Sequence, residues 1–320
     1  MSVIVRAKAL RRLFDVSKPW LNRVVEREPK AFLTAVADVD FEIEEGSVYA
    51  LVGESGSGKS TIGKMVVGLT SATDGTIEID GTAITGNDQK AKISEARQKL
   101  QMIFQDPYAS LNPRWKVRDI IAEPAKLRGF ETKGLPERLL QQVGLSPEDA
   151  DKYPHEFSGG QRQRICIARA LSSEPKVIVC DEPTSALDVS VQSQVLNLMS
   201  DLQEQLGLTY LFISHDLTVV EHMADKIGVL YLGALVEEAP KETLFASPLH
   251  PYTRMLFDAA PRLDGFGREI DVPKGEIPDP INPPPGCSFH PRCPLATSLC
   301  KTVRPQMRLI GDTRVSCHHV

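Results

Sequence analysis

Residues 53–60 form the first pattern whose residue types and spacing could do chemistry, with the sequence G-E-S-G-S-G-K-S. The spacing G-x-x-x-x-G-K-[ST] is typical of a loop whose glycines let backbone amides turn toward phosphate oxygens. In such a loop Lys59 reaches the β- and γ-phosphates, and the Ser60 hydroxyl ligates Mg²⁺. The pattern therefore predicts a site for a nucleoside triphosphate with Mg²⁺. The residues expected to bind the nucleotide here are Gly53, Ser55, Gly56, Gly58, Lys59, Ser60 and Thr61.

Two acidic residues follow a second apolar run, at 177–180. Asp181 stands at the expected carboxyl end of a buried strand. A carboxylate there could bind Mg²⁺ directly or contact one of the ligands of the ion. Successive side chains alternate along a strand, so we expect Glu182 on the opposite side from Asp181. There it could face the γ-phosphate and polarise the attacking water as a general base.

Ser158 and Gln161 predict the start of a helix, because a Ser followed three residues later by a Gln completes a capping box. Gly159 and Gly160 in the first turn weaken a helix, but they permit close approach of another backbone or of a phosphate. The bare amides at such a helix start also favour an anion. The segment is therefore a second candidate for phosphate binding.

These candidate residues need elements to position them. The loop at 53–60 lies between the apolar, strand-like run 48–52 and the helix-like run 61–69. Similar alternation of strands and helices continues to about residue 247 and predicts an α/β fold with a largely parallel sheet. The polar segment 15–30 is expected to be a loop.

The composition changes after residue 247. Eight of the 22 residues from 273 to 294 are proline, a density that no regular helix or central strand survives. We therefore expect two parts, residues 1–247 and an irregular, Cys- and Pro-rich extension at 248–320.

Charge and hydropathy exclude several classes of protein. The chain has 37 basic and 42 acidic residues, a net charge of −5, which argues against a protein that mainly binds nucleic acid. No apolar run approaches the roughly 18 residues that a membrane helix needs. The N-terminus lacks the long apolar stretch of a signal peptide, so we expect a soluble, cytosolic chain.

Further segments match a known family in order and spacing. Phe157–Gln161 is similar to the LSGGQ signature of the ABC transporter ATPase family, with Phe in place of Leu. Gln105 matches the family's Q-loop, residues 185–188 match its D-loop, and His215 matches its switch histidine. The resemblance covers about residues 1–247. It implies a P-loop NTPase core with an antiparallel β subdomain and a helical subdomain at about 105–170.

The resemblance also implies a mechanism of ATP hydrolysis. Two subunits would pack head to tail, with ATP between Lys59 of one chain and the helix start at Ser158 of the other. Gln105 would sense Mg²⁺ and the transporter, and His215 would hold the γ-phosphate and the attacking water. The implied catalytic residues are Glu182, His215 and Gln105; the implied Mg²⁺ residues are Ser60, Gln105 and Asp181; Asp181, Ser158, Gly160, Gln161 and Asp188 join the nucleotide-binding set.

An aromatic residue that stacks on adenine is expected just after the first strand in this family. The run Val3–Leu10 could be that strand, which makes Phe14 the best match. Trp20 and Phe32 stay open as alternatives, because the segment between them and the strand is longer than the minimal pattern.

Two segments of the extension narrow the resemblance. Residues 250–256 and 286–294 resemble the C-terminal extension of oligopeptide and dipeptide importer ATPases. This implies a subunit that energises peptide import, or import of nickel, glutathione or another small solute; a soluble ABC ATPase in repair or translation is the weaker alternative. The implied partners are a second ATPase subunit, identical or different, two transmembrane permease subunits and an extracytoplasmic substrate-binding protein. The chain would work at the cytoplasmic face of the membrane, without nucleic acid.

The six cysteines fall into two sets. Cys166 and Cys180 lie on apolar runs and read as core thiols. Four others crowd into the last 34 residues, where disulfides are disfavoured in a cytosolic protein. Zinc sites usually show tight C-x₂₋₄-C pairs, which are absent, whereas a [4Fe–4S] cluster does not require them. The family resemblance favours the cluster over Zn²⁺. The expected ligands are Cys287, Cys293, Cys300 and Cys317.

Overall fold

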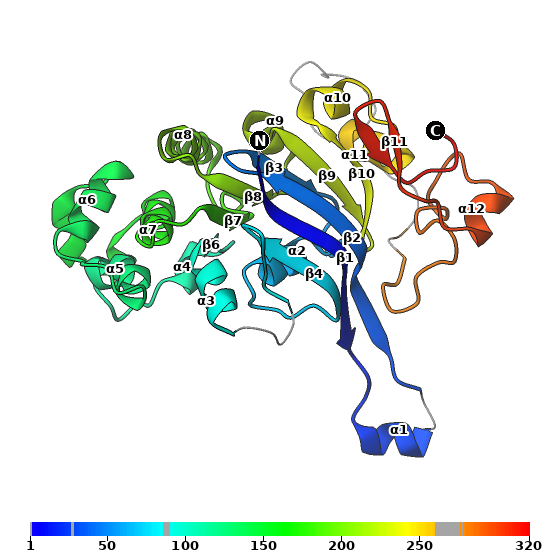
Figure 1. The fold of residues 1–320 in the computed structure, drawn as a ribbon, viewed down its shortest axis with the longest axis horizontal. Coiled ribbons are helices and arrows are strands. Elements are labelled where there is room, and N and C mark those ends of the chain that lie inside the picture. Colours follow the sequence, from blue (N-terminus) through cyan, green and yellow to red (C-terminus); the bar gives the residue numbers. More distant parts are fainter. Residues whose placement is uncertain (1, 27–28, 86–89, 260–275, 277) are drawn as a thin grey trace.

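A computed structural model describes residues 2–26, 29–85, 90–259, 276 and 278–320. Its backbone contains two sheets with helices around them (Figure 1). The smaller sheet has four strands in the order β2-β1-β4-β5, all antiparallel. The expected antiparallel subdomain is therefore present. Its strands are β1 (Val3–Asp15), β2 (Phe32–Glu44), β4 (Asp74–Ile79) and β5 (Thr82–Ala83).

The larger sheet has eight strands in the order β11-β12-β10-β9-β3-β8-β7-β6. The five strands from β9 to β6 pair in parallel, whereas β10, β12 and β11 continue the sheet antiparallel. Every residue of β3, β7 and β8 is buried, as expected for parallel strands covered on both faces. The strands are β3 (Val48–Val52), β6 (Leu100–Ile103), β7 (Val177–Asp181), β8 (Thr209–Ile213), β9 (Lys226–Tyr231), β10 (Ala234–Pro240), β11 (Arg308–Ile310) and β12 (Thr313–Val315).

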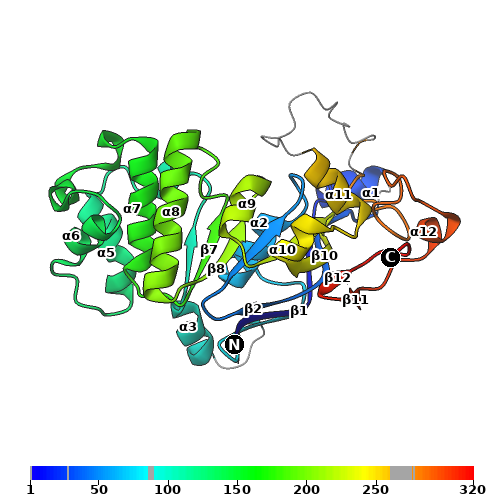
Figure 2. The same ribbon diagram turned by 90° about the horizontal axis from the view of Figure 1, so that it is seen from above.

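One hydrophobic core lies between the two sheets and takes in helix α2 (Lys59–Val66) through Ile62 and Met65. A second core joins the other face of the large sheet to a group of helices at one end of the molecule (Figure 2). These and the neighbouring helices are α3 (Lys90–Gln98), α4 (Pro107–Ser110), α5 (Val117–Leu127), α6 (Leu135–Gln142), α7 (Gly159–Leu171), α8 (Val189–Leu206) and α9 (Leu217–Met223).

Helix α5 runs unbroken through Pro124, although proline disfavours the interior of a helix. The proline removes one backbone donor but leaves its own carbonyl free, and that carbonyl accepts from the Arg128 amide at 3.3 Å. Ile120, Ile121 and Ala125 on the same helix are buried, so packing of the apolar face outweighs the missing hydrogen bond.

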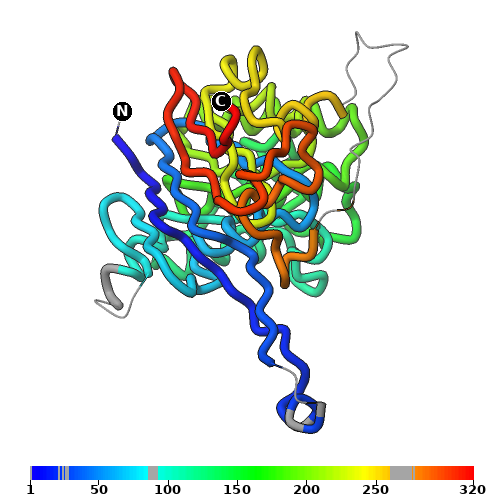
Figure 3. Tube along the Cα trace, turned by 90° about the vertical axis from the view of Figure 1, so that its right-hand side faces the viewer, coloured from blue at the N-terminus to red at the C-terminus, as the bar shows by residue number. Residues whose placement is uncertain are grey.

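The segment predicted as a loop at 15–30 contains a short helix, α1 (Trp20–Glu26). It sits at the tip of a long arm formed by β1 and β2, which projects well beyond the rest of the molecule (Figures 1 and 3). The loop prediction was therefore wrong for residues 20–26, whereas residues 16–19 and 29–30 form no helix or strand. Trp20 and Val25 are exposed on this arm. A helix is usually recognised in a sequence by the regular spacing of its buried apolar residues, and the described side chains of α1 offer no such pattern.

The extension is only partly irregular. Residues 278–297 contain no helix or strand, as the proline content predicted. On either side of them the chain forms regular elements, and β12 pairs with β10 through Glu237 and Val315, so the extension completes the edge of the large sheet. The division at residue 247 stays a prediction. The remaining helices are α10 (Lys241–Ala246), α11 (Pro251–Asp258) and α12 (Ser298–Thr302).

Within the described residues, the helices are all too short or too polar to cross a membrane.

Candidate functional site

The loop at 53–60 joins β3 to α2, and its backbone can be built only with glycine at two positions. Gly53 and Gly58 have φ angles of 147° and 105°. A Cβ at Gly53 would lie 2.2 Å from the Leu230 carbonyl oxygen, and one at Gly58 would lie 2.3 Å from the Ala35 carbonyl oxygen. The loop is thus wedged between β9 and β2, which fixes the direction of its amides.

Lys59 is held inside this loop. Its Nζ donates to the carbonyl oxygens of Gly53 at 2.7 Å and Glu54 at 2.9 Å, and the residue is 5% exposed. Burial lowers the pKa of Lys59, while the charges of Glu182 and Asp181 act in the opposite direction. A phosphate that enters the loop would meet an ammonium with little competing water, which strengthens their attraction.

Ser60 and Asp181, two of the residues predicted to bind Mg²⁺, lie in hydrogen-bond contact. The Ser60 hydroxyl donates to the Asp181 carboxylate at 2.7 Å, and Asp181 is 5% exposed. Burial raises the pKa of Asp181. A cation bound beside it would act in the opposite direction and favour the ionised carboxylate. A hydroxyl and a carboxylate oxygen are the hard donors that Mg²⁺ prefers, and the residues present therefore fit this ion.

Glu182 does not continue strand β7, contrary to the alternation predicted from the sequence. Its φ is 47°, in the left-handed region, so the backbone turns away from the strand at this residue. Its carboxylate nevertheless contacts the other two residues that the family resemblance implied to be catalytic, Gln105 and His215. Gln105 Nε2 donates to Oε2 at 2.8 Å, and His215 Nδ1 lies 3.1 Å from Oε1. The turn, not strand alternation, brings these three side chains together.

The rest of the predicted loop set lies around this centre. Ser55 and Gly56 are exposed, and Thr61 is half-buried in the first turn of α2. The His215 side chain is 60% exposed, whereas that of Glu182 is 16% exposed. The candidate base is therefore shielded while its two partners face solvent. The structure brings residues from the ends of β3, β6, β7 and β8 to one edge of the sheet.

The predicted capping box at Ser158 is present. The Gln161 amide donates to Ser158 Oγ at 3.3 Å, and the Ser158 amide donates to Gln161 Oε1 at 2.9 Å. Ser158, Gly159 and Gln161 are exposed at the start of α7. Helix α7 lies apart from α2 in two views of the molecule (Figures 1 and 2). The signature segment thus forms a separate exposed surface of the same chain.

Gly160 has a packing role that the sequence reasoning missed. It is buried, and a Cβ there would lie 2.3 Å from Cγ1 of Val191 on α8. The same construction at Gly159 gives an ordinary 3.6 Å contact with Leu187. Gly160 therefore allows α7 to pack closely against α8, and this role is independent of any contact between its amide and a phosphate. Asp188, at the start of α8, is exposed and makes no side-chain cap.

The candidate adenine-stacking residue lies on the β1–β2 arm. Phe14 pairs with Leu33 of β2, and the Arg12 guanidinium lies 4.4 Å from the centroid of its ring. Ala35, two residues beyond Leu33, is the residue that faces Gly58 of the loop. Phe14 is therefore within reach of the loop along the sheet. Trp20 is 68% exposed on α1 and Phe32 is 42% exposed, and the choice among the three stays a prediction.

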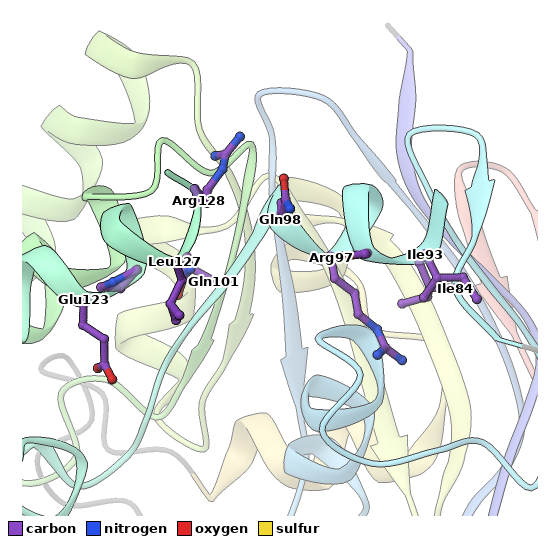
Figure 4. A pocket seen from close by; sticks show the side chains of 10 residues that line it. Ile84, Ile93, Arg97, Gln98, Gln101, Glu123, Leu127 and Arg128 are labelled. Carbon is purple, nitrogen blue, oxygen red and sulfur yellow. The ribbon is translucent and has the colours of Figure 1, made fainter. Parts of the chain in front are cut away.

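A groove next to the helical end was not predicted. A cavity of about 820 Å³ lies between α3 and α5 (Figure 4). Arg97 and Gln98 line it from α3, Glu123 and Leu127 from α5, and Gln101 from β6. Leu127 is 82% exposed. The sequence does not distinguish Leu127 from a buried leucine, so it could not predict the groove.

The four late cysteines do not form a ready ligand set. Cys300 Sγ lies 3.4 Å from His319 Nε2, and the His319 amide donates to Cys317 Sγ at 3.4 Å. Burial raises the pKa of the Cys287 and Cys293 thiols, and the neighbouring thiols add to that effect. Yet no group of three or more Cys, His, Asp or Glu in the described part of the chain is placed to hold a metal ion. The metal prediction therefore gains no support from the geometry.

The other two cysteines behave as expected. Cys166 and Cys180 are buried in α7 and β7, and burial raises the pKa of both thiols.

A strand–loop–helix phosphate site, a buried Ser–Asp pair and a Glu between Gln and His define a P-loop nucleotide hydrolase with a helical insertion. Two solved structures have the same fold. The ATP-binding cassette MJ0796 bound to ADP and Pi has a TM-score of 0.64 and 26% identity, over 74% of this chain and 99% of that one. The cbiO1 protein from Clostridium perfringens has a TM-score of 0.64 and 26% identity, over 77% and 92%.

Sequence comparison narrows this class. Family models described as "ABC transporter" and "Oligopeptide/dipeptide transporter, C-terminal region" match residues 36–185 and 236–300. The dipeptide transport ATP-binding protein DppF of Haemophilus influenzae is 48% identical, over 99% of this chain and 97% of its own. The oligopeptide transport ATP-binding protein AppF of Bacillus subtilis is 48% identical, over 98% and 97%. The di/tripeptide transport protein DppF of Pseudomonas aeruginosa is 45% identical, over 100% and 98%.

The chain therefore belongs to the ABC transporter ATPase family, in the branch that carries the oligopeptide/dipeptide transporter C-terminal region.

Proposed function

We propose that this ATPase energises the import of di- or oligopeptides through a membrane permease. Two findings support peptides as the cargo. Residues 236–300 match the peptide-transporter region, and the names of the relatives specify peptide transport. The Ser60–Asp181 pair and the Glu182 cluster support the hydrolytic chemistry. The chain would work as a peripheral subunit at the cytoplasmic face of the membrane.

The residues of the site have distinct tasks in this proposal. The loop amides and Lys59 bind the β- and γ-phosphates. Ser60 and Asp181, with Gln105 at the edge, would hold Mg²⁺, which neutralises phosphate charge when it is bound. Water attacks the γ-phosphorus while the bond to the β,γ-bridging oxygen breaks, and Glu182 accepts the proton of the water.

In this proposal His215 orients that water. Its ring nitrogen lies 3.1 Å from Glu182, and most of the side chain faces solvent, where the γ-phosphate would enter. Gln105 holds the other carboxylate oxygen, so a movement of either neighbour re-aims the base. Chemistry would thus start only when Gln105 and His215 are both correctly placed.

The site is completed by a second subunit in this proposal. Ser158 and Gln161 are exposed at the start of α7, apart from the loop of their own chain. Ser158 Oγ already accepts the amide of Gln161. The other backbone amides at the start of α7 would be the donors for the γ-phosphate of a partner's ATP. Asp188, at the start of α8, is exposed as well. The partner is an identical or a related ATPase subunit.

The groove between α3 and α5 is the proposed contact with the permease (Figure 4). Gln101, on its wall, lies four residues before Gln105 on the same strand-to-loop segment. A helix of the permease that fills the groove would therefore press on the segment that positions Glu182. An extracytoplasmic binding protein would deliver the peptide on the other side of the membrane.

A transport measurement tests the choice of cargo. The chain, with its own permease and binding protein, would be reconstituted in proteoliposomes and supplied with labelled dipeptide, pentapeptide, nickel or glutathione. We expect uptake of peptide that requires internal ATP and disappears in Lys59→Ala. Uptake of nickel or glutathione without peptide would overturn the cargo while leaving the ATPase role intact.

We also propose that the four late cysteines bind iron–sulfur or zinc, with [4Fe–4S] favoured. Their donor chemistry supports this, since four thiols lie within 34 residues. No step of the mechanism depends on such a metal. Anaerobic purification followed by iron, sulfide and zinc analysis tests the proposal. Four irons and four sulfides per chain would support the cluster, zinc alone would select the alternative, and neither metal would overturn both.

A further inference from the structure

Glu54, inside the phosphate-binding loop, is held at three points. Its carbonyl oxygen accepts from Lys59 Nζ at 2.9 Å. Its amide donates to the Tyr252 hydroxyl at 2.9 Å. Its carboxylate accepts from both terminal nitrogens of Arg292, at 2.7 and 2.9 Å. Two of these three partners belong to the extension after residue 247, although Glu54 occupies a variable position of the loop pattern.

The Glu54–Arg292 pair is well shielded from water. The Arg292 side chain is 3% exposed and that of Glu54 is 24% exposed. A paired fork of two N–H donors on one carboxylate fixes direction as well as distance, and it is stronger than a neutral hydrogen bond. Removal of the Arg292 charge would leave a shielded carboxylate without its partner. The loop would then rearrange to bring that carboxylate to water.

An aromatic cluster holds both partners in place. The rings of Tyr231 and Tyr252 lie 4.6 Å apart, and Phe289 lies 5.2 Å from Tyr231 and 5.5 Å from Tyr252. The Arg292 guanidinium lies 5.8 Å from the Tyr231 centroid and 6.0 Å from that of Phe289. These contacts tie strand β9, helix α11 and the turn before Cys293 into one support under the loop.

We propose that Arg292 and Tyr252 are positioning residues for ATP binding, so that the extension forms part of the nucleotide site. The proposal rests on the MgATP function proposed above. Glu54 and Lys59 share a hydrogen bond, so a displaced Glu54 would move the partner that orients the Lys59 ammonium. Arg292 directly precedes Cys293, and hence the fold of the cysteine-rich segment would reach the phosphates through this pair.

Nucleotide affinity of the full-length chain tests this directly. Arg292→Gln should weaken MgATP binding about 10-fold, the size expected when a charged hydrogen bond is lost. Arg292→Lys should recover part of that loss, because it restores the charge without the fork. The matched control is Arg304→Gln, which removes another arginine of the extension that pairs with Asp38 at 3.5 Å in an exposed site. This control should bind MgATP like the wild type.

A double-mutant cycle separates positioning from general stability. Glu54→Gln should weaken MgATP binding, and the Glu54→Gln/Arg292→Gln double variant should bind no worse than the weaker single variant. In the assembled transporter the KM for ATP should rise, with kcat within about twofold of the wild type. Strictly additive losses, or affinities that follow the thermal midpoint alone, would overturn the proposal.

A further variant covers the case in which Arg292→Gln does not fold. Tyr252→Phe keeps the ring packing and removes only the hydroxyl that accepts the Glu54 amide. It should weaken MgATP binding about threefold with a near-native thermal midpoint, as for one neutral hydrogen bond. Unchanged affinity in Tyr252→Phe and in the Arg292 variants would refute the positioning role. A wild type that does not bind MgATP would instead refute the proposed function itself.

Discussion

The Ser60 hydroxyl and the Asp181 carboxylate lie 2.7 Å apart, although 121 residues separate them along the chain. The contact joins the first turn of α2 to the end of β7. Because Asp181 is 5% exposed, the pair places a nearly dry carboxylate beside the phosphate-binding loop.

This contact predicts that Asp181 sets the Mg²⁺ requirement. In Asp181→Asn, the Mg²⁺ concentration that half-saturates ATP binding should rise about 10-fold or more, because the amide lacks the anionic donor. A nucleotide-binding titration at fixed ATP measures this. The control is Asp151→Asn, which removes an exposed carboxylate paired with Lys116 and Arg118. Equal Mg²⁺ midpoints in the two variants would show that Asp181 has no such role.

The contact between α7 and α8 predicts a sharp difference between two adjacent glycines. Gly160→Ala would place a methyl group 2.3 Å from Val191 and should lower the free energy of unfolding by about 1–3 kcal/mol. Gly159→Ala meets only an ordinary 3.6 Å contact, and it should stabilise the helix by up to about 1 kcal/mol. Denaturant unfolding measures both.

Restoring space should rescue the first variant. Gly160→Ala combined with Val191→Ala should recover much of the lost stability, because the added methyl group replaces a removed one. If both glycine variants lose the same stability, or if Val191→Ala gives no rescue, the packing explanation is wrong.

The sequence predicted those features that local patterns encode. Apolar runs gave β3 over the observed Val48–Val52, the spacing of glycines gave the phosphate loop, and a Ser and a Gln three residues apart gave the cap of α7. The features that it could not predict depend on distant neighbours. Three examples are the backbone turn at Glu182, the close packing of Val191 against Gly160, and the hydrogen bonds from Arg292 to Glu54. Each arises only when segments far apart in the chain pack together.

Acid should destabilise the protein through His250. Its Nδ1 accepts the Tyr252 amide at 3.0 Å, an arrangement that requires a neutral ring. Burial lowers the pKa of His250 to about 4, and the charge of Arg254 acts in the same direction. The folded chain thus binds this proton less readily than the unfolded chain does. The stabilisation is fully present above about pH 6.5 and is lost as the pH falls through 4.

The difference between the two pKa values corresponds to about 3 kcal/mol between pH 7 and pH 4. His250→Asn keeps an oxygen that can cap α11 but does not titrate. The wild type should therefore lose about 3 kcal/mol more unfolding free energy than this variant over that range. Curves of stability against pH that run parallel for the two proteins would contradict the assignment.

The most direct test of the hydrolytic site is Glu182→Gln. The Glu182 carboxylate accepts a hydrogen bond from Gln105 Nε2 at 2.8 Å and lies 3.1 Å from His215 Nδ1. The variant therefore keeps the shape of the cluster and removes the proton acceptor. Glu174→Gln is the matched control, because Glu174 is an exposed glutamate with a similar φ of 48° and no place in the site. ATP hydrolysis and ATP binding would be measured for both variants in the assembled transporter. The account predicts that Glu182→Gln loses at least about 100-fold in hydrolysis while it retains ATP affinity and accumulates an ATP-bound dimer, with Glu174→Gln unchanged. Hydrolysis at the wild-type rate in Glu182→Gln would contradict the account.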